Sequence, residues 1–158
     1  MDPKDITFMK SGFNNLVEED EEIENTGSIV MVFMQNAMQN ADIYVKHAKR
    51  NEITPEDIKR GLMLEVFFMK NRPNMLEKCE EMKQMIKDII KDEEENGETY
   101  YIEDNEEEEK ESNEEFSESK HNCAMCNCFN TIYTRWENFT PELPMEHILV
   151  KAINEINP

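Results

Sequence analysis

Glycine is scarce in this chain, with four in 158 residues, each standing alone. A phosphate-binding glycine loop is therefore absent from the sequence. Nucleophile–base motifs and paired catalytic carboxylates are absent too, so we expect a protein that is not an enzyme and has no small-molecule substrate. Long apolar runs are also missing, because the segments Ile29 to Met34 and Leu62 to Met69 are too short to span a bilayer. Without a leader peptide or lipidation motif, no membrane contact is expected.

Basic residues are also few, with 17 Lys and Arg against 36 Asp and Glu and a formal net charge of −19. The basic surface typical of a DNA-binding module is therefore lacking. Most of the excess acid lies in residues 92–120, where fifteen acidic residues face only Lys110 and Lys120. So few large apolar residues occur there that we predict an acidic disordered linker. It would serve as a solubilising spacer or as a surface that mimics nucleic acid and holds a basic partner.

The apolar spacing elsewhere predicts an all-α protein. Residues 6–16 read as a short helix, residues 18–24 as an acidic loop, and residues 26–49 as a long central helix. Thr54 is a good N-cap for the next helix, with Pro55 at its first position and Asp57 at its third. Residues 73–91 continue as an additional amphipathic helix.

The long helix is apolar over more than one face and would span about 36 Å at ~1.5 Å per residue. A monomer core is the simpler interpretation, but we judge the surrounding sequence too short to cover such a helix. We therefore predict that the chain forms a dimer. The expected interface residues are Phe33, Ala37, Met38, Ala41, Tyr44, Ala48, Ile58 and Leu62.

Residues 5–70 resemble the histone fold, and histone four and archaeal histones in particular. The resemblance is carried by Val32-Phe33, Asn36, Ala41, Tyr44 and the tetrapeptide His47-Ala48-Lys49-Arg50. It implies a histone-fold domain over residues 1–72, with a short helix, a long central helix and a short helix. It also implies pairing with another histone-fold chain, a heterodimer being favoured over a homodimer. Arg50 and Asp57 match the family's arginine–aspartate position, which implies a structural ion pair.

The loops depart from the family where histones contact DNA. The first expected loop is acidic and the second contains Glu52, so that only Lys49 and Arg50 are DNA-proximal cations. Glutamates there repel the duplex phosphates, and we expect DNA binding only indirectly or through a basic partner.

The leading hypothesis is a histone-like subunit of a chromatin-like or transcription-factor assembly. One alternative is a genome-packaging histone variant, as in a large DNA virus, and another is an acidic histone chaperone. The expected location is nuclear or chromatin-associated, or the virion or viral factory for a viral protein.

Residues 121–158 differ in composition from the acidic segment that precedes them. Cysteine is concentrated at its start, where a zinc site would use His121, Cys123, Cys126 and Cys128, with His147 as the other candidate. Free reduced thiols without a cofactor, which we favour, and a redox pair are the alternatives. Four aromatic residues and an amphipathic helix over residues 145–156 follow. This segment is too short for an independent core, so it should dock on the preceding helices or bind a partner.

Overall fold

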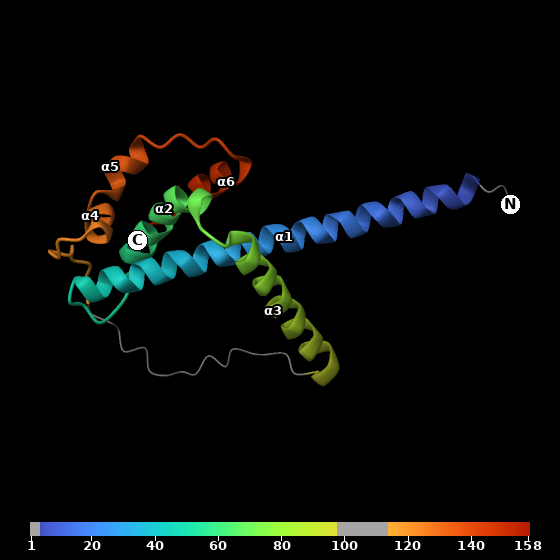
Figure 1. Ribbon diagram of the computed structural model, residues 1–158, viewed down its shortest axis with the longest axis horizontal. Coiled ribbons are helices and arrows are strands. Elements are labelled where there is room, and N and C mark those ends of the chain that lie inside the picture. The colour runs from blue at the N-terminus through green and yellow to red at the C-terminus, as the bar shows by residue number, and fades with distance from the viewer. Residues whose placement is uncertain (1–3, 98–113) are drawn as a thin grey trace. The chain divides into compact units, whose positions relative to one another are not determined.

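The fold is given by a computed structural model, which describes the backbone of residues 4–97 and 114–158 and the side chains of residues 24–97 and 114–158 (Figure 1). Every regular element in these ranges is a helix, so the all-α prediction is confirmed. They are α1 (Lys4–His47), α2 (Pro55–Phe68), the 3-10 turn η1 (Met69–Asn71), α3 (Met75–Asn96), α4 (Ala124–Asn130), α5 (Ile132–Glu137) and α6 (Pro144–Asn154). Within the described part of the chain, no helix has both the length and the apolar character needed to cross a bilayer.

Helix α1 corrects one prediction, because it runs without a break from Lys4 to His47. The short first helix and the long central helix are parts of this one element, and the loop predicted at residues 18–24 is helical. Apolar periodicity is lost there, but glutamate is a good helix former and no glycine or proline interrupts the run. Helix propensity therefore continues the helix where the apolar pattern stops.

The link between α1 and α2 is closed by backbone and side-chain hydrogen bonds. Lys49, two residues after the end of α1, has a φ of 59°, and the Arg50 N–H donates to the Val45 carbonyl over 3.1 Å. Thr54 caps α2 as predicted, its hydroxyl accepting from the Asp57 N–H at 3.3 Å, while the Asp57 carboxylate accepts from the Thr54 N–H at 2.8 Å. This reciprocal pair satisfies two donors that the start of a helix otherwise leaves free.

The chain divides into two compact units. The first contains residues 4–32 and 74–97, with α3 and the earlier part of α1. Helix α3 extends past residue 91 to Asn96, so the first residues of the predicted disordered linker are helical. Asp92 to Glu95 have no helix breaker among them, and Gly97 stops the helix with a φ of 60°. Residues 98–113, the middle of that linker, lie outside the described residues.

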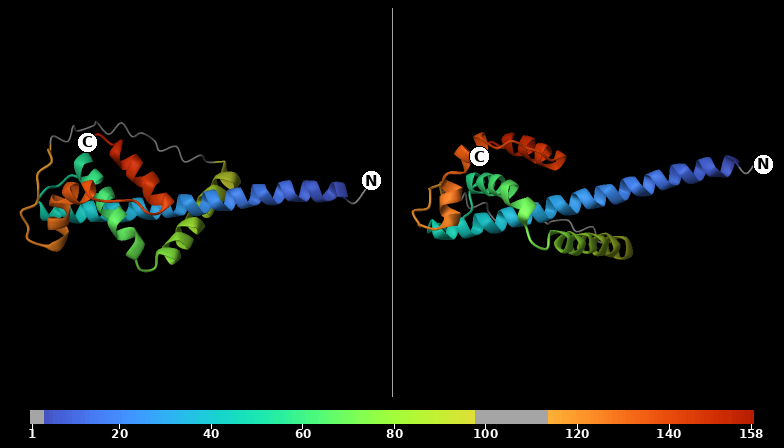
Figure 2. Two further views of the ribbon diagram at one scale, coloured as in Figure 1. Left: turned by 90° about the horizontal axis from the view of Figure 1, so that it is seen from above. Right: turned by 45° about the horizontal axis from the view of Figure 1, so that its top comes forward.

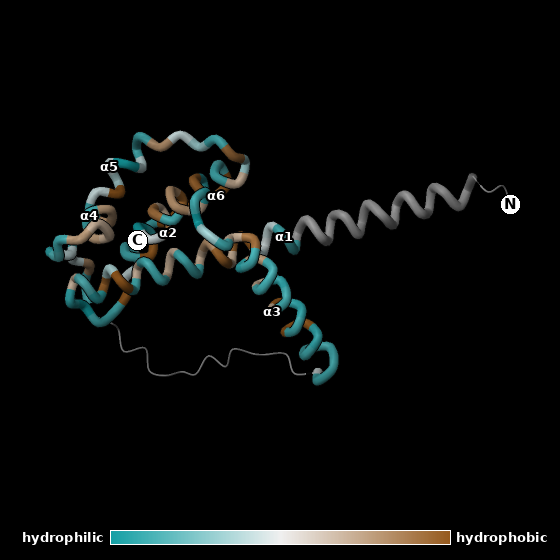
Figure 3. The backbone as a smooth tube through the Cα atoms, in the orientation of Figure 1, coloured by the Kyte–Doolittle hydropathy of each residue, from teal (hydrophilic) through white to brown (hydrophobic). Residues whose placement is uncertain are grey.

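The second unit contains residues 33–73 and 114–158. Helix α2 contacts α4, α5 and α6, and α6 lies beside α2 in both Figures 1 and 2. The apolar residues of α2, α4 and α6 are visible in Figure 3, where α3 is largely hydrophilic. The core of this unit consists of Phe33, Tyr44, Met63, Leu64, Val66, Cys126, Phe129, Ile132, Leu149 and Ile153. Residues 121–158 thus dock on the preceding helices, one of the two outcomes expected for them.

Tyr44 of α1 lies at the centre of this docking. Its ring stacks on Phe129 at a centroid distance of 4.4 Å, and Phe116 lies 6.5 Å from it. Its hydroxyl donates to Asn130 Oδ1 over 2.6 Å and accepts from the Ser119 N–H at 3.1 Å. The end of the predicted linker is therefore packed against the core, because one aromatic ring and a buried serine anchor it despite the acidic residues around them.

Most of the residues predicted for the dimer interface are buried or partly buried in the single chain. Four of them, Phe33, Ala37, Ala41 and Tyr44, are buried within the single chain. Ala48, Ile58 and Leu62 are partly buried, and Met38 is 39% exposed. The premise that the chain is too short to cover this face is wrong, because Gly61 of α2 lies against Ala37 and Ala41, and Phe116 and Phe129 lie against Tyr44. The dimer remains a prediction, and Met38 is the one member of the predicted set that is exposed.

Gly61 allows α1 and α2 to approach closely. A Cβ at this position would lie 2.7 Å from the backbone oxygen of Ala37, which cannot move aside as a side chain can. Gly61→Ala is therefore expected to lower the free energy of unfolding by a net of about 1 kcal/mol or more, although alanine gains about 1 kcal/mol in helix propensity. Gly27→Ala is the matched control, because nothing lies within 4 Å of a Cβ there. It should stabilise the protein; equal effects of the two changes in urea unfolding would contradict the close approach.

Candidate metal centre

His47 is the last residue of α1, and the turn that follows holds it in place. The Ala48 N–H donates to the Tyr44 carbonyl over 2.9 Å, and the Lys49 N–H donates to the Lys46 carbonyl over 3.1 Å. The imidazole is partly buried, on the side of α1 that faces the C-terminal residues. Its backbone is therefore fixed by the end of the helix.

The segment from His121 to Cys126 lies against the His47 side chain. The His121 N–H donates to Ser119 Oγ over 3.1 Å, and the Cys123 N–H donates to the His121 carbonyl over 3.2 Å. Cys123 is the N-cap of α4, and its sulfur accepts from the Cys126 N–H at 3.4 Å. The Cys-x-x-Cys spacing at the start of a helix thus turns both sulfurs to one side.

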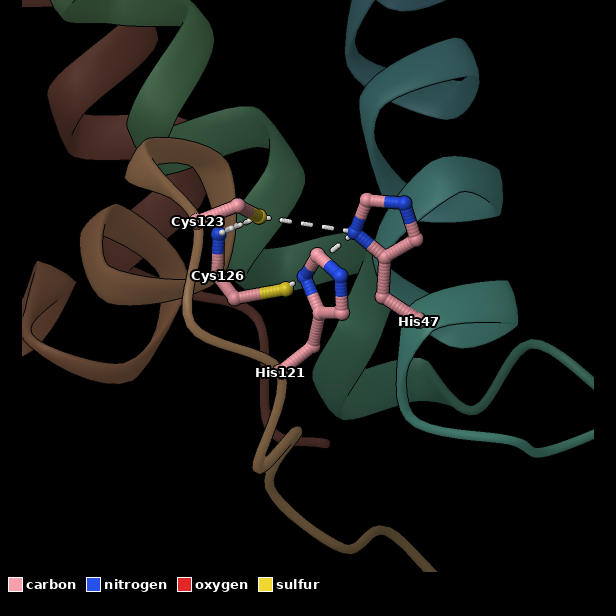
Figure 4. A group of neighbouring side chains, drawn as sticks. All are labelled: His47, His121, Cys123 and Cys126. Atoms are coloured by element: carbon pink, nitrogen blue, oxygen red, sulfur yellow. Dashed lines mark hydrogen bonds between the residues drawn. The ribbon is translucent and has the colours of Figure 1, made fainter.

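Four side chains converge at this point, as Figure 4 shows: His47, His121, Cys123 and Cys126. One ligand atom from each lies within 4.8 Å of the others. His47 Nδ1 is 3.5 Å from Cys123 Sγ and 3.4 Å from Cys126 Sγ, and the two imidazole centroids are 4.4 Å apart. Two nitrogens and two sulfurs therefore surround one point in space.

The two thiols differ in acidity. Hydrogen bonds, first from the Cys126 N–H and then from the His121 side chain, lower the pKa of the Cys123 thiol to about 6. Burial raises the pKa of the Cys126 thiol, whose side chain is fully enclosed. At neutral pH Cys123 is mainly a thiolate, which is the form that binds metals and attacks electrophiles. Cys126 needs a cation beside it to lose its proton.

The cluster differs from the site predicted from the sequence. Three of the four predicted residues meet, but Cys128 lies apart, where its sulfur accepts from Arg135 Nη1 at 3.6 Å. His147 is exposed on α6 and is not in the cluster. His47 takes the fourth place and was missed, because 76 residues separate it from Cys123. The one available signal was that the chain has only three histidines.

A second arrangement of charged groups lies at the link between α1 and α2. Arg50 Nη1 and Nη2 donate to the two carboxylate oxygens of Asp57 over 2.7 and 2.6 Å, and both side chains are buried. The Arg50 guanidinium also lies 5.3 Å from the centre of the Phe116 ring. Of the two residues predicted to be DNA-proximal, only Lys49 is therefore exposed.

The N–H groups of that link already have an anionic partner. The Glu114 carboxylate accepts from the Asn51 N–H at 3.1 Å and from the Glu52 N–H at 2.8 Å. A residue of the predicted acidic linker therefore occupies these donors.

Comparison with protein-family models, curated proteins and solved structures found no match to this chain.

Proposed function

We propose that this chain is a non-enzymatic, histone-like subunit that pairs with another histone-fold chain in a chromatin-like or transcription-factor assembly. The observation that supports it best is the contact between Arg50 and Asp57. These residues carry part of the resemblance to histones, and their bidentate ion pair fixes the link between α1 and α2. The capping box at Thr54 supports the same unit.

The proposed pairing surface is the exposed side of α1. Met34 is 52% exposed and Met38 is 39% exposed, and their spacing of four residues places them on one helical face. Exposed methionines adapt to irregular apolar partners. Met38 belongs to the interface predicted from the sequence. The buried residues of that predicted interface belong to the core of the chain and lie beneath the exposed side of α1.

Direct DNA binding is not part of the proposal. Arg50 is held by Asp57, and Glu114 occupies the N–H groups of Asn51 and Glu52. A duplex phosphate near this link would meet the carboxylates of Glu52 and Glu114 beside one exposed cation, Lys49. Contact with DNA therefore requires a basic partner.

The pairing is tested by purifying the tagged full chain from its native cells and measuring its molar mass. We expect a one-to-one complex with a chain that carries its own histone fold. Met34→Glu combined with Met38→Glu should weaken this complex by at least about 100-fold, because an unpaired buried carboxylate costs several kcal/mol. The neighbouring exposed residues Gln35 and Gln39 provide the control, since the same change to glutamate there should leave pairing intact.

Three outcomes would contradict the proposal. A folded monomer at micromolar concentration would remove pairing altogether. Tight, steeply salt-dependent duplex binding by the pure chain would favour the genome-packaging alternative. Release of captured histones on deletion of residues 98–113, with no effect of the methionine changes, would favour the acidic chaperone.

A further inference from the structure

We propose that His47, His121, Cys123 and Cys126 bind one structural Zn²⁺ ion, which joins the end of α1 to the start of α4. This inference concerns a metal site and does not depend on the proposed function. All four residues belong to the second compact unit. The ion would be held by two thiolates and two imidazoles and by no other group.

The distances fit a tetrahedral zinc site. Zinc binds sulfur at about 2.3 Å and imidazole nitrogen at about 2.0–2.1 Å, which places sulfur and nitrogen ligands roughly 3.6 Å apart in a tetrahedron. His47 Nδ1 lies 3.5 and 3.4 Å from the two sulfurs, close to that value. The remaining separations reach 4.8 Å at most, so small side-chain rotations bring all four atoms to ligand distance. Hydrogen bonds among these groups do not by themselves bring all four ligand atoms around one point.

The types of ligand favour zinc over other ions. A tetrahedral set of two sulfurs and two nitrogens suits Zn²⁺, whereas Ca²⁺ and Mg²⁺ require oxygen ligands. Two cysteines and two histidines also hold a Rieske iron–sulfur cluster, but there the cysteines bind one iron and the histidines the other. His47 Nδ1 lies 3.5 and 3.4 Å from the two sulfurs, a separation that fits ligands of a single ion. Four protein ligands close the coordination sphere, so the ion would have a structural role and no open position for a substrate.

The charges are also consistent with a bound dication. Two thiolates neutralise Zn²⁺, so the ion and its ligands carry no net charge in a partly buried place. The Cys126 N–H already points at Cys123 Sγ and stabilises a thiolate there. Both thiols would bind as thiolates and release their protons as the ion binds. An open pocket lined in part by His47, Lys49 and His121 gives the ion a route from solvent.

A bound ion would add a covalent-like connection where the chain has little regular structure. Residues 114–122 contain no helix, and Ser119 and Phe116 are their main anchors to the core. The ion would fix residues 121–126 onto α1, next to the stacked rings of Tyr44 and Phe129. The metal would therefore help hold the C-terminal residues over the face that they cover.

The test uses the full chain, expressed with zinc and purified in the presence of a reductant. Elemental analysis should give one zinc per chain, and Co²⁺ exchanged into the site should show the intense visible absorption of tetrahedral thiolate coordination. His47→Gln and Cys123→Ser should each weaken zinc binding more than about 100-fold, since changes outside the ligand sphere already cost 10- to 100-fold. Cys128→Ser and His147→Gln are the matched controls and should retain full zinc.

A second measurement keeps the test valid if a ligand variant fails to fold. In the unaltered protein, zinc should shield Cys123 and Cys126 from alkylation, and a chelator should expose them while leaving the rate at Cys128 unchanged. The proposal is overturned by zinc-free protein with reduced thiols, or by an alkylation pattern that the chelator does not alter. It is equally overturned if Cys128→Ser removes the metal and His47→Gln does not, which would restore the site predicted from the sequence.

Discussion

Replacing Arg50 with methionine is expected to lower the free energy of unfolding by roughly 3 kcal/mol or more, because the change leaves the buried Asp57 carboxylate without its partner. The Asp57 side chain is 0% exposed and its two oxygens accept from both Arg50 Nη atoms. Exchanging both residues for apolar ones should cost less than either single change, since no charge then remains buried. Lys46→Met is the control, because the Lys46–Asp42 pair lies on the surface and should contribute at most about 1 kcal/mol.

The same pair gives a pH dependence with a definite sign. Burial by itself would raise the pKa of the Asp57 carboxyl, but hydrogen bonds from Arg50 and Thr54 outweigh burial and lower the pKa below its ordinary value of 3.8. Its contribution to stability is therefore complete above that value and is lost as the pH falls through the lower pKa of the folded state. Urea unfolding from neutral to acid pH measures this, and Asp57→Asn should lack this part of the acid sensitivity. A double-mutant cycle with no coupling between Arg50 and Asp57 would refute the interpretation.

Phe129→Ala is expected to lower the free energy of unfolding by about 3–5 kcal/mol, as is usual for removal of a buried aromatic ring. Phe129 is fully buried and lies against the Tyr44 ring. Its loss should also weaken the attachment of the C-terminal residues, because the stack joins them to Tyr44 of α1.

Trp136 provides a local measurement of that detachment. It is the chain's one tryptophan and stacks on Phe139, with a centroid distance of 5.9 Å, while Phe67 of α2 lies 6.3 Å away. Its fluorescence should shift to the red in Phe129→Ala before global unfolding. Phe68→Ala is the control, since Phe68 is 36% exposed and should cost much less. If the two variants lose the same stability, Phe129 does not anchor the C-terminal residues.

The parts of the fold that the sequence predicts well are those determined by neighbours along the chain. The cap at Thr54 and the pair of Arg50 with Asp57 span three and seven residues, so their partners are near by covalent connection alone. The loop expected at residues 18–24 was wrong because apolar periodicity was given more weight than the helix propensity of glutamate. Periodicity indicates which face is buried, and a helix needs no buried face in every turn.

The parts that the sequence does not predict depend on distant contacts. His47 joins two cysteines 76 and 79 residues away, and nothing local to His47 indicates this. The roles of Phe116 and Ser119 cannot be read from composition, since an acidic average says little about where a single side chain of the segment packs. The sequence predicts docking of residues 121–158 as one of two outcomes. It also predicts that another chain covers the face of α1 on which these residues dock.

The long separation between Tyr44 and Asn130, 86 residues, also determines the order of events during synthesis. A ribosome adds about 5–20 residues per second, so Phe129 is made roughly 3–12 s after α2 is complete. Helices form in microseconds, and α1 and α2 can therefore meet long before their cover exists. Through that interval the Tyr44 ring lacks the Phe129 ring that later stacks on it, whereas Ala41 can already lie against Gly61 of α2. The contact between α1 and α2 can therefore form first, and the stack of Tyr44 on Phe129 is added later in synthesis.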